Sequence, residues 1–221
     1  MRGAIPGVDA LRPRFRGVFH QYAFFASLIT GAVLVLVAPT RKATTAAAIY
    51  AASVSGLFGA SALYHRITWR PATRRWMRRL DHSMIFVLIA GTYTPFSLLI
   101  LHGTLSTVVL ALVWGGALAG VILKLAWIDA PKWLMSLVYL ALGWVGVVTV
   151  PQVLSRAGVG AVTLLIVGGV LYSAGAVIYA LRRPDPRPTV FGYHEIFHVL
   201  VIAAAAAHYA AIAAYALPAA G

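Results

Sequence analysis

Residues 194–217 read HEIFHVLVIAAAAAHYAAIAAYAL, an almost uninterrupted apolar run with ionisable groups at its start. An α-helix needs about 20 mostly apolar residues to cross the hydrocarbon of a membrane, and this run is long enough. Its first turn contains His194 and His198. Residues four positions apart lie on one face of a helix, so both imidazoles can reach a single ion. The run therefore predicts a transmembrane helix with a candidate metal site at its end.

The rest of the chain has the same apolar character. Of its 221 residues, 61% are hydrophobic and only 10% are charged, which is the composition of a membrane protein. Apolar runs of spanning length lie at roughly 19–38, 44–64, 82–101, 104–126, 133–150, 160–181 and 194–217. We therefore expect an all-α polytopic membrane protein, a seven-transmembrane helix bundle that forms a single domain over residues 1–221. The first run is too long for a secretory signal, so we expect it to remain as a span.

Positive charge is concentrated in alternate loops. The net charge is +13, and 15 of the 18 Lys and Arg residues fall on one side of the predicted bundle. The positive-inside rule then places the N-terminus in the cytoplasm and the C-terminus outside. Because topology accounts for the charge, no nucleic-acid partner is expected. The 15 residues are Arg2, Arg12, Arg14, Arg16, Arg66, Arg70, Arg74, Arg75, Arg78, Arg79, Lys124, Lys132, Arg182, Arg183 and Arg187.

Three separate segments bring polar side chains to the same predicted face. His65 ends the second run, Asp81 precedes the third, and His194 and His198 begin the seventh. The chain has no cysteine, so a metal would rest on histidine, carboxylate or water. His65 and Asp81 are the candidates for a third ligand. Ser61 shares a helix face with His65, which suits a role beside the metal or substrate, although a serine also bonds readily to its own helix.

Each of these residues also has a simpler interpretation. His65 could be an interfacial residue stabilised by a helix C-terminus, and Asp81 could be the N-cap of the third helix. We expect His20 and His82 to be polar residues at headgroup level rather than ligands. For His208, about 21 Å along the helix from the first histidine of the pair, we expect a hydrogen bond across helices, with a place in a cavity wall as the second possibility.

Residues 194–198 also match HExxH, the zinc-binding motif of metalloproteases in which the glutamate is the general base. The metzincin extension requires glycine and histidine where this chain has Val201 and Ala204, and no acid follows His198 to complete a gluzincin site. A metalloprotease is therefore the weakest of the enzymatic hypotheses. For Glu195 we expect a carboxylate that interacts with the helix dipole and faces water.

Three motifs together resemble the hemolysin III branch of the progestin and adipoQ receptor (PAQR) family, which includes the adiponectin receptors. They are SALYHR (61–66), LDHSMIFVLIAGTYTPF (80–96) and FGYHEIFHVLVIAAAAAHY (191–209). The resemblance implies a seven-helix bundle whose N-terminus is inside, with zinc near the cytoplasmic face held by three histidines and a water. The family's first motif, an acidic residue and an asparagine, is not kept in RGVFHQ (16–21), where His20 is the remaining polar piece.

Carried over position by position, the resemblance assigns zinc to His65, His194 and His198. It assigns Ser61 to the serine of the same motif, and it places Asp81 at the zinc-coordinated water rather than on the metal. Three protein ligands leave one position for a water whose pKa falls toward about 7, as in zinc hydrolases. We therefore expect a catalytic role for Asp81 and Ser61.

At inner-leaflet depth, lipid amides or esters are the substrates within reach, and the family's similarity to alkaline ceramidases points the same way. A lipid hydrolase-like protein in a bacterial inner membrane is our first hypothesis, with membrane lipids as partners. The alternative is a non-enzymatic, receptor-like regulator of membrane homeostasis in which zinc is structural. A cytolytic, hemolysin-like role is a third, although no helix carries a charged stripe able to line a pore. The sequence specifies neither the lipid nor the oligomeric state.

Overall fold

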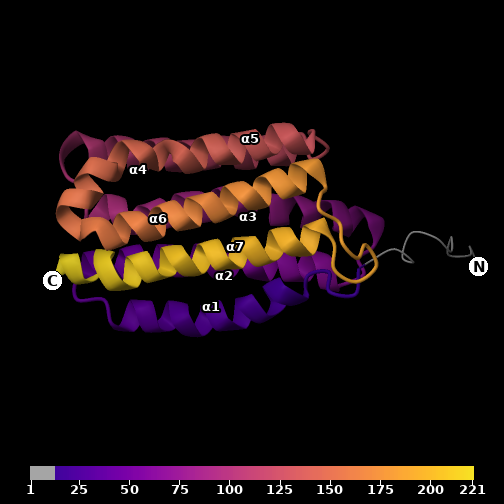
Figure 1. Cartoon of the computed structure of the whole chain (residues 1–221), viewed down its shortest axis with the longest axis horizontal. Coiled ribbons are helices and arrows are strands. Elements are labelled where there is room, and N and C mark those ends of the chain that lie inside the picture. The colour runs from indigo at the N-terminus through magenta and orange to yellow at the C-terminus, as the bar shows by residue number, and fades with distance from the viewer. Residues whose placement is uncertain (1–12) are drawn as a thin grey trace, which may run out of the picture.

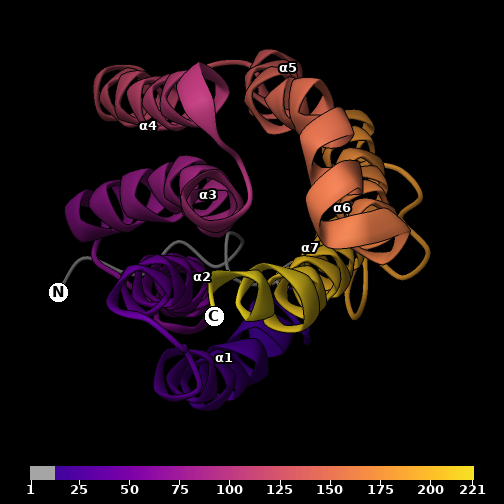
Figure 2. The same cartoon turned by 90° about the vertical axis from the view of Figure 1, so that its left-hand side faces the viewer.

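A computed structural model describes residues 13–221, which form a bundle of helices without a β-strand in that part of the chain (Figures 1 and 2). The all-α prediction is confirmed. Among the predicted loop cations, Arg2 and Arg12 lie outside the described residues. The helices are α1 (Val18–Leu36), α2 (Arg41–Arg66), α3 (Pro71–Leu99), α4 (Gly103–Ala126), α5 (Lys132–Gly143), α6 (Val150–Leu181) and α7 (Tyr193–Ala211). A 3-10 helix (Trp144–Thr149) joins α5 to α6, and a π-helical turn (Ile212–Ala216) and a 3-10 turn (Pro218–Ala220) follow α7.

Within residues 13–221, six helical segments are long and apolar enough to cross a membrane. One of them, Lys132–Leu181, is 50 residues long and contains both α5 and α6. Gly158 interrupts it with a φ of 81° and a ψ of 176°, a conformation that glycine tolerates. Figures 1 and 2 show α5 and α6 side by side. The seven-span count and the orientation of the termini stay predictions.

Helix α3 begins well before the apolar run that predicted it. It starts at Pro71, a residue suited to the first helical turn, and its N-cap position is Arg70. The alternative interpretation of Asp81 as the N-cap of this helix is therefore wrong, because Asp81 lies ten residues inside it. Apolar length marks where a helix meets lipid, whereas arginine-rich turns outside that region remain good helix formers.

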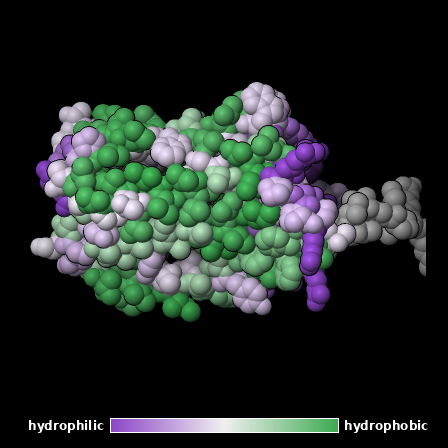
Figure 3. Space-filling view, viewed as in Figure 1, coloured by the Kyte–Doolittle hydropathy of each residue, from purple (hydrophilic) through white to green (hydrophobic). Residues whose placement is uncertain are grey.

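The outer surface of the bundle suits a lipid environment. Large apolar side chains are exposed along the helices, for example Leu36 (83%), Ile29 (68%) and Val159 (69%). Figure 3 shows apolar side chains over the flank and hydrophilic ones gathered at the end where α7 begins. We call this the basic end, because the cations at the end of α2, the start of α3, the end of α4 and the start of α5 lie there.

Small residues allow the helices to pack closely. A Cβ at Gly120 would collide with the ring of Phe86, which is fully buried between α3 and α4. Likewise a Cβ at Gly56 would meet the methyl group of Met84 across the α2–α3 contact. The close contacts of α2 with α3 matter for the site, because these two helices deliver His65 and Asp81.

Candidate metal centre and cavity

Three histidines from two helices meet at the basic end. His65 stands in the last turn of α2, and His194 and His198 stand in the first two turns of α7. One ligand atom from each lies within 4.8 Å of the others. The Nε2 atoms of His65 and His194 are 3.2 Å apart. Two nitrogens that bind one tetrahedral zinc at 2.0–2.1 Å lie about 3.4 Å apart, so this spacing fits a shared zinc ion.

The chemistry of the donor set fits a metal as well. His65 and His198 are buried, at 7% and 2% exposed. Nδ1 of His198 is buried and has no hydrogen-bond partner in the described part of the chain. Neutral imidazoles close together, with little access to water, are the ligands that zinc prefers where thiolates are absent.

Glu195 holds the start of α7 in place. Its Oε2 accepts a hydrogen bond from the backbone N–H of Gly192 at 2.9 Å, which caps the helix, and its Oε1 accepts from Nε of Arg16. The residue is fully buried. The expectation that Glu195 faces water is therefore wrong, because the N-terminal arm folds over it: Arg14 and Phe15 pair with the backbone of residues 189 and 190. No sequence motif predicted the path of this N-terminal arm.

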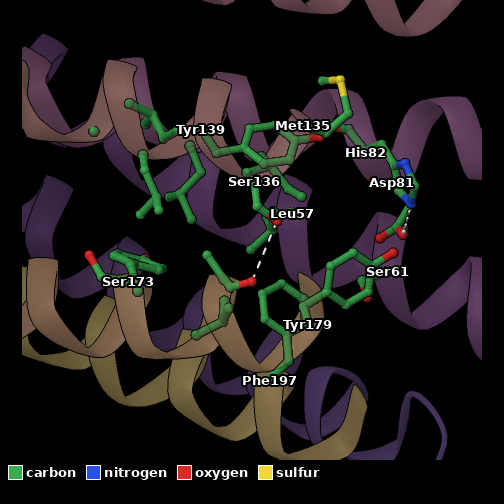
Figure 4. A pocket seen from close by; sticks show the side chains of 18 of the residues that line it. Leu57, Ser61, Asp81, His82, Met135, Ser136, Tyr139, Ser173, Tyr179 and Phe197 are labelled. Atoms are coloured by element: carbon green, nitrogen blue, oxygen red, sulfur yellow. Dashed lines mark hydrogen bonds and ion pairs between the residues drawn. The ribbon is translucent and has the colours of Figure 1, made fainter. Parts of the chain in front are cut away.

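Asp81 approaches the histidines from α3. Its Oδ2 lies 3.9 Å from Nε2 of His65 and 4.0 Å from Nε2 of His82. Figure 4 shows Asp81, His82 and Ser61 gathered at one end of a cavity. The structure thus brings the predicted carboxylate and serine to the same place as the three histidines.

His20 is a member of the site that sequence reasoning missed. Its ring stacks on that of His198, with centroids 3.8 Å apart and planes at 9°. Its Nδ1 is hydrogen-bonded to Oγ of Ser61 at 2.8 Å, so this serine faces a neighbouring helix and not its own backbone. His20 and His82 both line the cavity, and that they lie at headgroup level stays a prediction. Helix spacing gave no signal for His20 as a member of the site, because Arg16 lies in a turn before α1 begins.

The cavity runs from the histidines into the membrane-spanning part of the bundle. Its volume is about 160 Å³, and His194 and His208 both line it. Because His198 and His208 are ten residues apart on α7, the cavity extends about 15 Å along that helix. The ring of His208 is hydrogen-bonded through Nε2 to the carbonyl of Leu165 at 3.2 Å, which confirms the predicted bond across helices. Aromatic and aliphatic side chains form most of the wall, as Figure 4 shows around Tyr139, Leu57 and Phe197.

The sequence is similar to those of known proteins. Residues 8–209 match the model of the family described as "Haemolysin-III related". The chain belongs to this family. It is 36% identical over 168 residues to a hemolysin-3 homolog of Bacillus subtilis (strain 168), covering 76% of this chain and 75% of the relative. It is 33% identical over 202 residues to hemolysin-3 of Bacillus cereus, covering 87% of each.

The haemolysin-III-related chain also has more distant relatives in plants and animals. It is 30% identical over 149 residues to the heptahelical transmembrane protein ADIPOR2 of Oryza sativa subsp. japonica, which covers 61% of this chain and 65% of the relative. The resemblance to the PAQR family is therefore confirmed. With its six apolar helical segments and its bacterial relatives, it is a multi-pass membrane protein, and the bacterial inner membrane is the supported location.

Proposed function

We propose that this haemolysin-III-related protein is a zinc-dependent hydrolase that cleaves an amide or ester bond of a membrane lipid. The observation that carries the proposal is the meeting of three histidines and one carboxylate at the end of a cavity with a mostly apolar wall. His65, His194 and His198 offer three ligand atoms within 4.8 Å, and Asp81 lies 3.9 Å from the first of them. Structural zinc sites use four protein ligands, whereas catalytic sites use three and keep one position open.

The three histidines would hold the zinc, which as a Lewis acid polarises a carbonyl and makes a water more acidic. Asp81 stands beside this position on another helix, where its carboxylate can hold the attacking water and accept its proton. The oxygen of that water adds to the lipid carbonyl, and the proton passes to the departing alcohol or amine. In this scheme Asp81 is the general base.

His20 and Ser61 support the site from α1 and α2. Their mutual hydrogen bond at 2.8 Å, and the stack of His20 on His198, restrict the orientation of one metal ligand. Outer partners of this kind orient metal ligands and affect metal affinity. The apolar cavity then receives an acyl chain, with the scissile bond at its basic end.

The variant Asp81→Asn tests the proposal. We expect purified Asp81→Asn protein to contain as much zinc as the wild type but to lose turnover by about 10²–10⁴-fold on any lipid amide or ester that the wild type hydrolyses, the usual contribution of a general base. Asp129→Asn is the matched control, since Asp129 is an exposed aspartate outside the cavity. Retained turnover in Asp81→Asn, with zinc present, would contradict the proposal.

A non-enzymatic role with structural zinc is the second candidate. The 3.9 Å separation of Asp81 and His65 would allow the carboxylate to complete a four-ligand shell with a small movement. Zinc would then connect α2, α3 and α7 in a receptor-like or regulatory protein. Closed four-ligand coordination in X-ray absorption spectra favours this role. So does a wild-type phenotype in Asp81→Asn combined with a lost phenotype in His194→Ala.

A further inference from the structure

Positive charge lines the cavity that contains the metal centre. Three cationic side chains, Arg78, Lys124 and Lys132, line the cavity, and Asp81 is the one carboxylate among its lining residues. The cations come from three helices: Arg78 from α3, Lys124 from the last turn of α4, and Lys132 from the start of α5. A divalent metal at the histidines would add to this excess. A ligand that enters the cavity therefore meets a positive surface at the basic end.

Lys124 is the most informative of these cations. Its side chain is 1% exposed, and within residues 13–221 it forms no hydrogen bond and no ion pair. A lysine near a membrane surface normally extends its ammonium group to water, and a buried unpaired ammonium is costly. The positive-inside rule explains why a cation is found at this end of the bundle, but it does not explain a cation that turns inward.

The other two cations line the same cavity as Lys124. Arg78 interacts electrostatically with both lysines, and all three act on the ring of His82. The guanidinium of Arg78 pairs with Asp129 at 2.8 Å, at the exposed side of the group. Nζ of Lys132 lies 4.4 Å from the ring centre of Tyr179, which in turn packs against His194. The three cations thus line the cavity at the basic end of the bundle, where the metal centre also lies.

The position of the cations relative to Asp81 restricts the shape of the ligand. Arg78 and Asp81 are three residues apart and so lie on one face of α3, about one turn from each other. An anionic group bound by the cations would stand about one helical turn from the carboxylate, with the rest of the ligand extending along the apolar cavity. A phosphate with an acyl chain attached a few bonds away has this form, and the forked donors of arginine suit it.

We propose that Arg78, Lys124 and Lys132 form a binding site for the phosphate of an anionic phospholipid whose acyl chain occupies the cavity. The lipid class is then a phosphate-bearing ester lipid, and neutral lipids without a phosphate bind less tightly. Binding does not require turnover; only the statement that the bound lipid is also the substrate rests on the proposed function.

Native mass spectrometry of the full chain in detergent, titrated with dioleoyl phosphatidic acid, tests the site. We expect Lys124→Met to raise the Kd at least about tenfold, the effect of losing a charge-assisted hydrogen bond. Lys124→Arg keeps the charge and should stay within about threefold of wild type. Arg75→Gln is the control, because it removes an equal charge from an exposed position of α3 that does not line the cavity. If Lys124→Met fails to fold, Lys132→Met takes its place with the same expected loss.

Two competitors show which part of phosphatidic acid the protein binds. We expect neither inorganic phosphate nor dioleoylglycerol, each at the concentration of the lipid, to displace phosphatidic acid. Displacement by inorganic phosphate would show that free phosphate is the ligand. Displacement by dioleoylglycerol would show that the protein recognises the acyl chains and not the phosphate. Either result overturns the proposal. An unchanged Kd in Lys124→Met also overturns the proposal. So does an equal loss of affinity in Arg75→Gln and Lys124→Met, because it would show that only surface charge attracts the lipid.

The same samples distinguish this inference from the proposed hydrolase. Lys124→Met should keep its zinc, because no ligand is changed. If the wild type hydrolyses no lipid but Lys124→Met still loses phosphatidic acid, the hydrolase proposal fails and the phosphate site stands. If Asp81→Asn loses turnover while Lys124→Met binds normally, the phosphate site fails and the hydrolase stands.

Discussion

Removal of either partner of the Arg16–Glu195 ion pair should destabilise the protein, and by unequal amounts. The Glu195 side chain is 0% exposed, whereas that of Arg16 is 22% exposed. In Arg16→Gln the carboxylate stays buried and keeps only the backbone N–H of Gly192 as a partner. In Glu195→Gln the amide oxygen can still accept from Gly192, and Arg16 can turn toward water. The arginine variant is therefore the more damaging one.

The burial of each side chain sets the expected loss of unfolding free energy. Leaving a buried charge without its partner costs about 3–5 kcal/mol of unfolding free energy, which we expect for Arg16→Gln. Losing one charge-assisted hydrogen bond costs about 1.5–3 kcal/mol, which we expect for Glu195→Gln. Asp129→Asn breaks an exposed pair with Arg78, whose side chains are 66% and 34% exposed, and should cost less than about 1 kcal/mol.

Unfolding in mixed micelles, followed by tryptophan fluorescence, measures these differences, and turnover is measured on the same samples. The order of loss should be Arg16→Gln, then Glu195→Gln, then Asp129→Asn, with zinc and turnover retained in Glu195→Gln. Equal losses for all three would refute the structural role of the pair. Lost turnover in Glu195→Gln with unchanged stability would instead make Glu195 a general base, as in metalloproteases.

Two further substitutions test how α1 supports the site. Gly17 has a φ of 78°, and a Cβ there would lie 2.5 Å from Cβ of His65. Gly17→Ala should therefore lower the unfolding free energy by about 2–5 kcal/mol. It should also weaken zinc binding, which a zinc titration of the metal-free protein measures. His20→Phe keeps a ring against His198 but removes the hydrogen bond between His20 and Ser61, so the unfolding free energy should fall by about 0.5–1.5 kcal/mol and zinc should bind less tightly. Wild-type stability in either variant would contradict the packing described for α1.

Much of the fold follows from apolar length alone. The predicted run at 104–126 matches α4 (Gly103–Ala126), because both ends of that helix coincide with the edge of the apolar segment. The prediction was poorer for α3, whose first turns are basic and carry no apolar signal. The connection left between the runs ending at 150 and starting at 160 was too long, since the helix continues from Val150 and is interrupted at Gly158. Hydropathy identifies the parts that contact lipid, and it contains no term for helix that extends beyond them.

The site was predictable where residues share a helix and less so where different helices meet. The pairing of His194 with His198 follows from spacing, and topology added His65. Contacts of the N-terminal arm could not be predicted in this way. The burial of Glu195 under Arg16 and the stack of His20 on α7 depend on how the arm folds back, and no periodic pattern encodes that path.

We propose that His65 of α2 and the histidine pair of α7 hold one zinc ion together. Metal analysis of purified wild-type and His65→Ala protein tests it most directly, with Asp81→Asn as the comparison. We expect about one zinc per chain in the wild type and in Asp81→Asn, and loss of zinc in His65→Ala while the protein stays folded. A full complement of zinc in His65→Ala, or a folded wild type that binds no zinc, would contradict it.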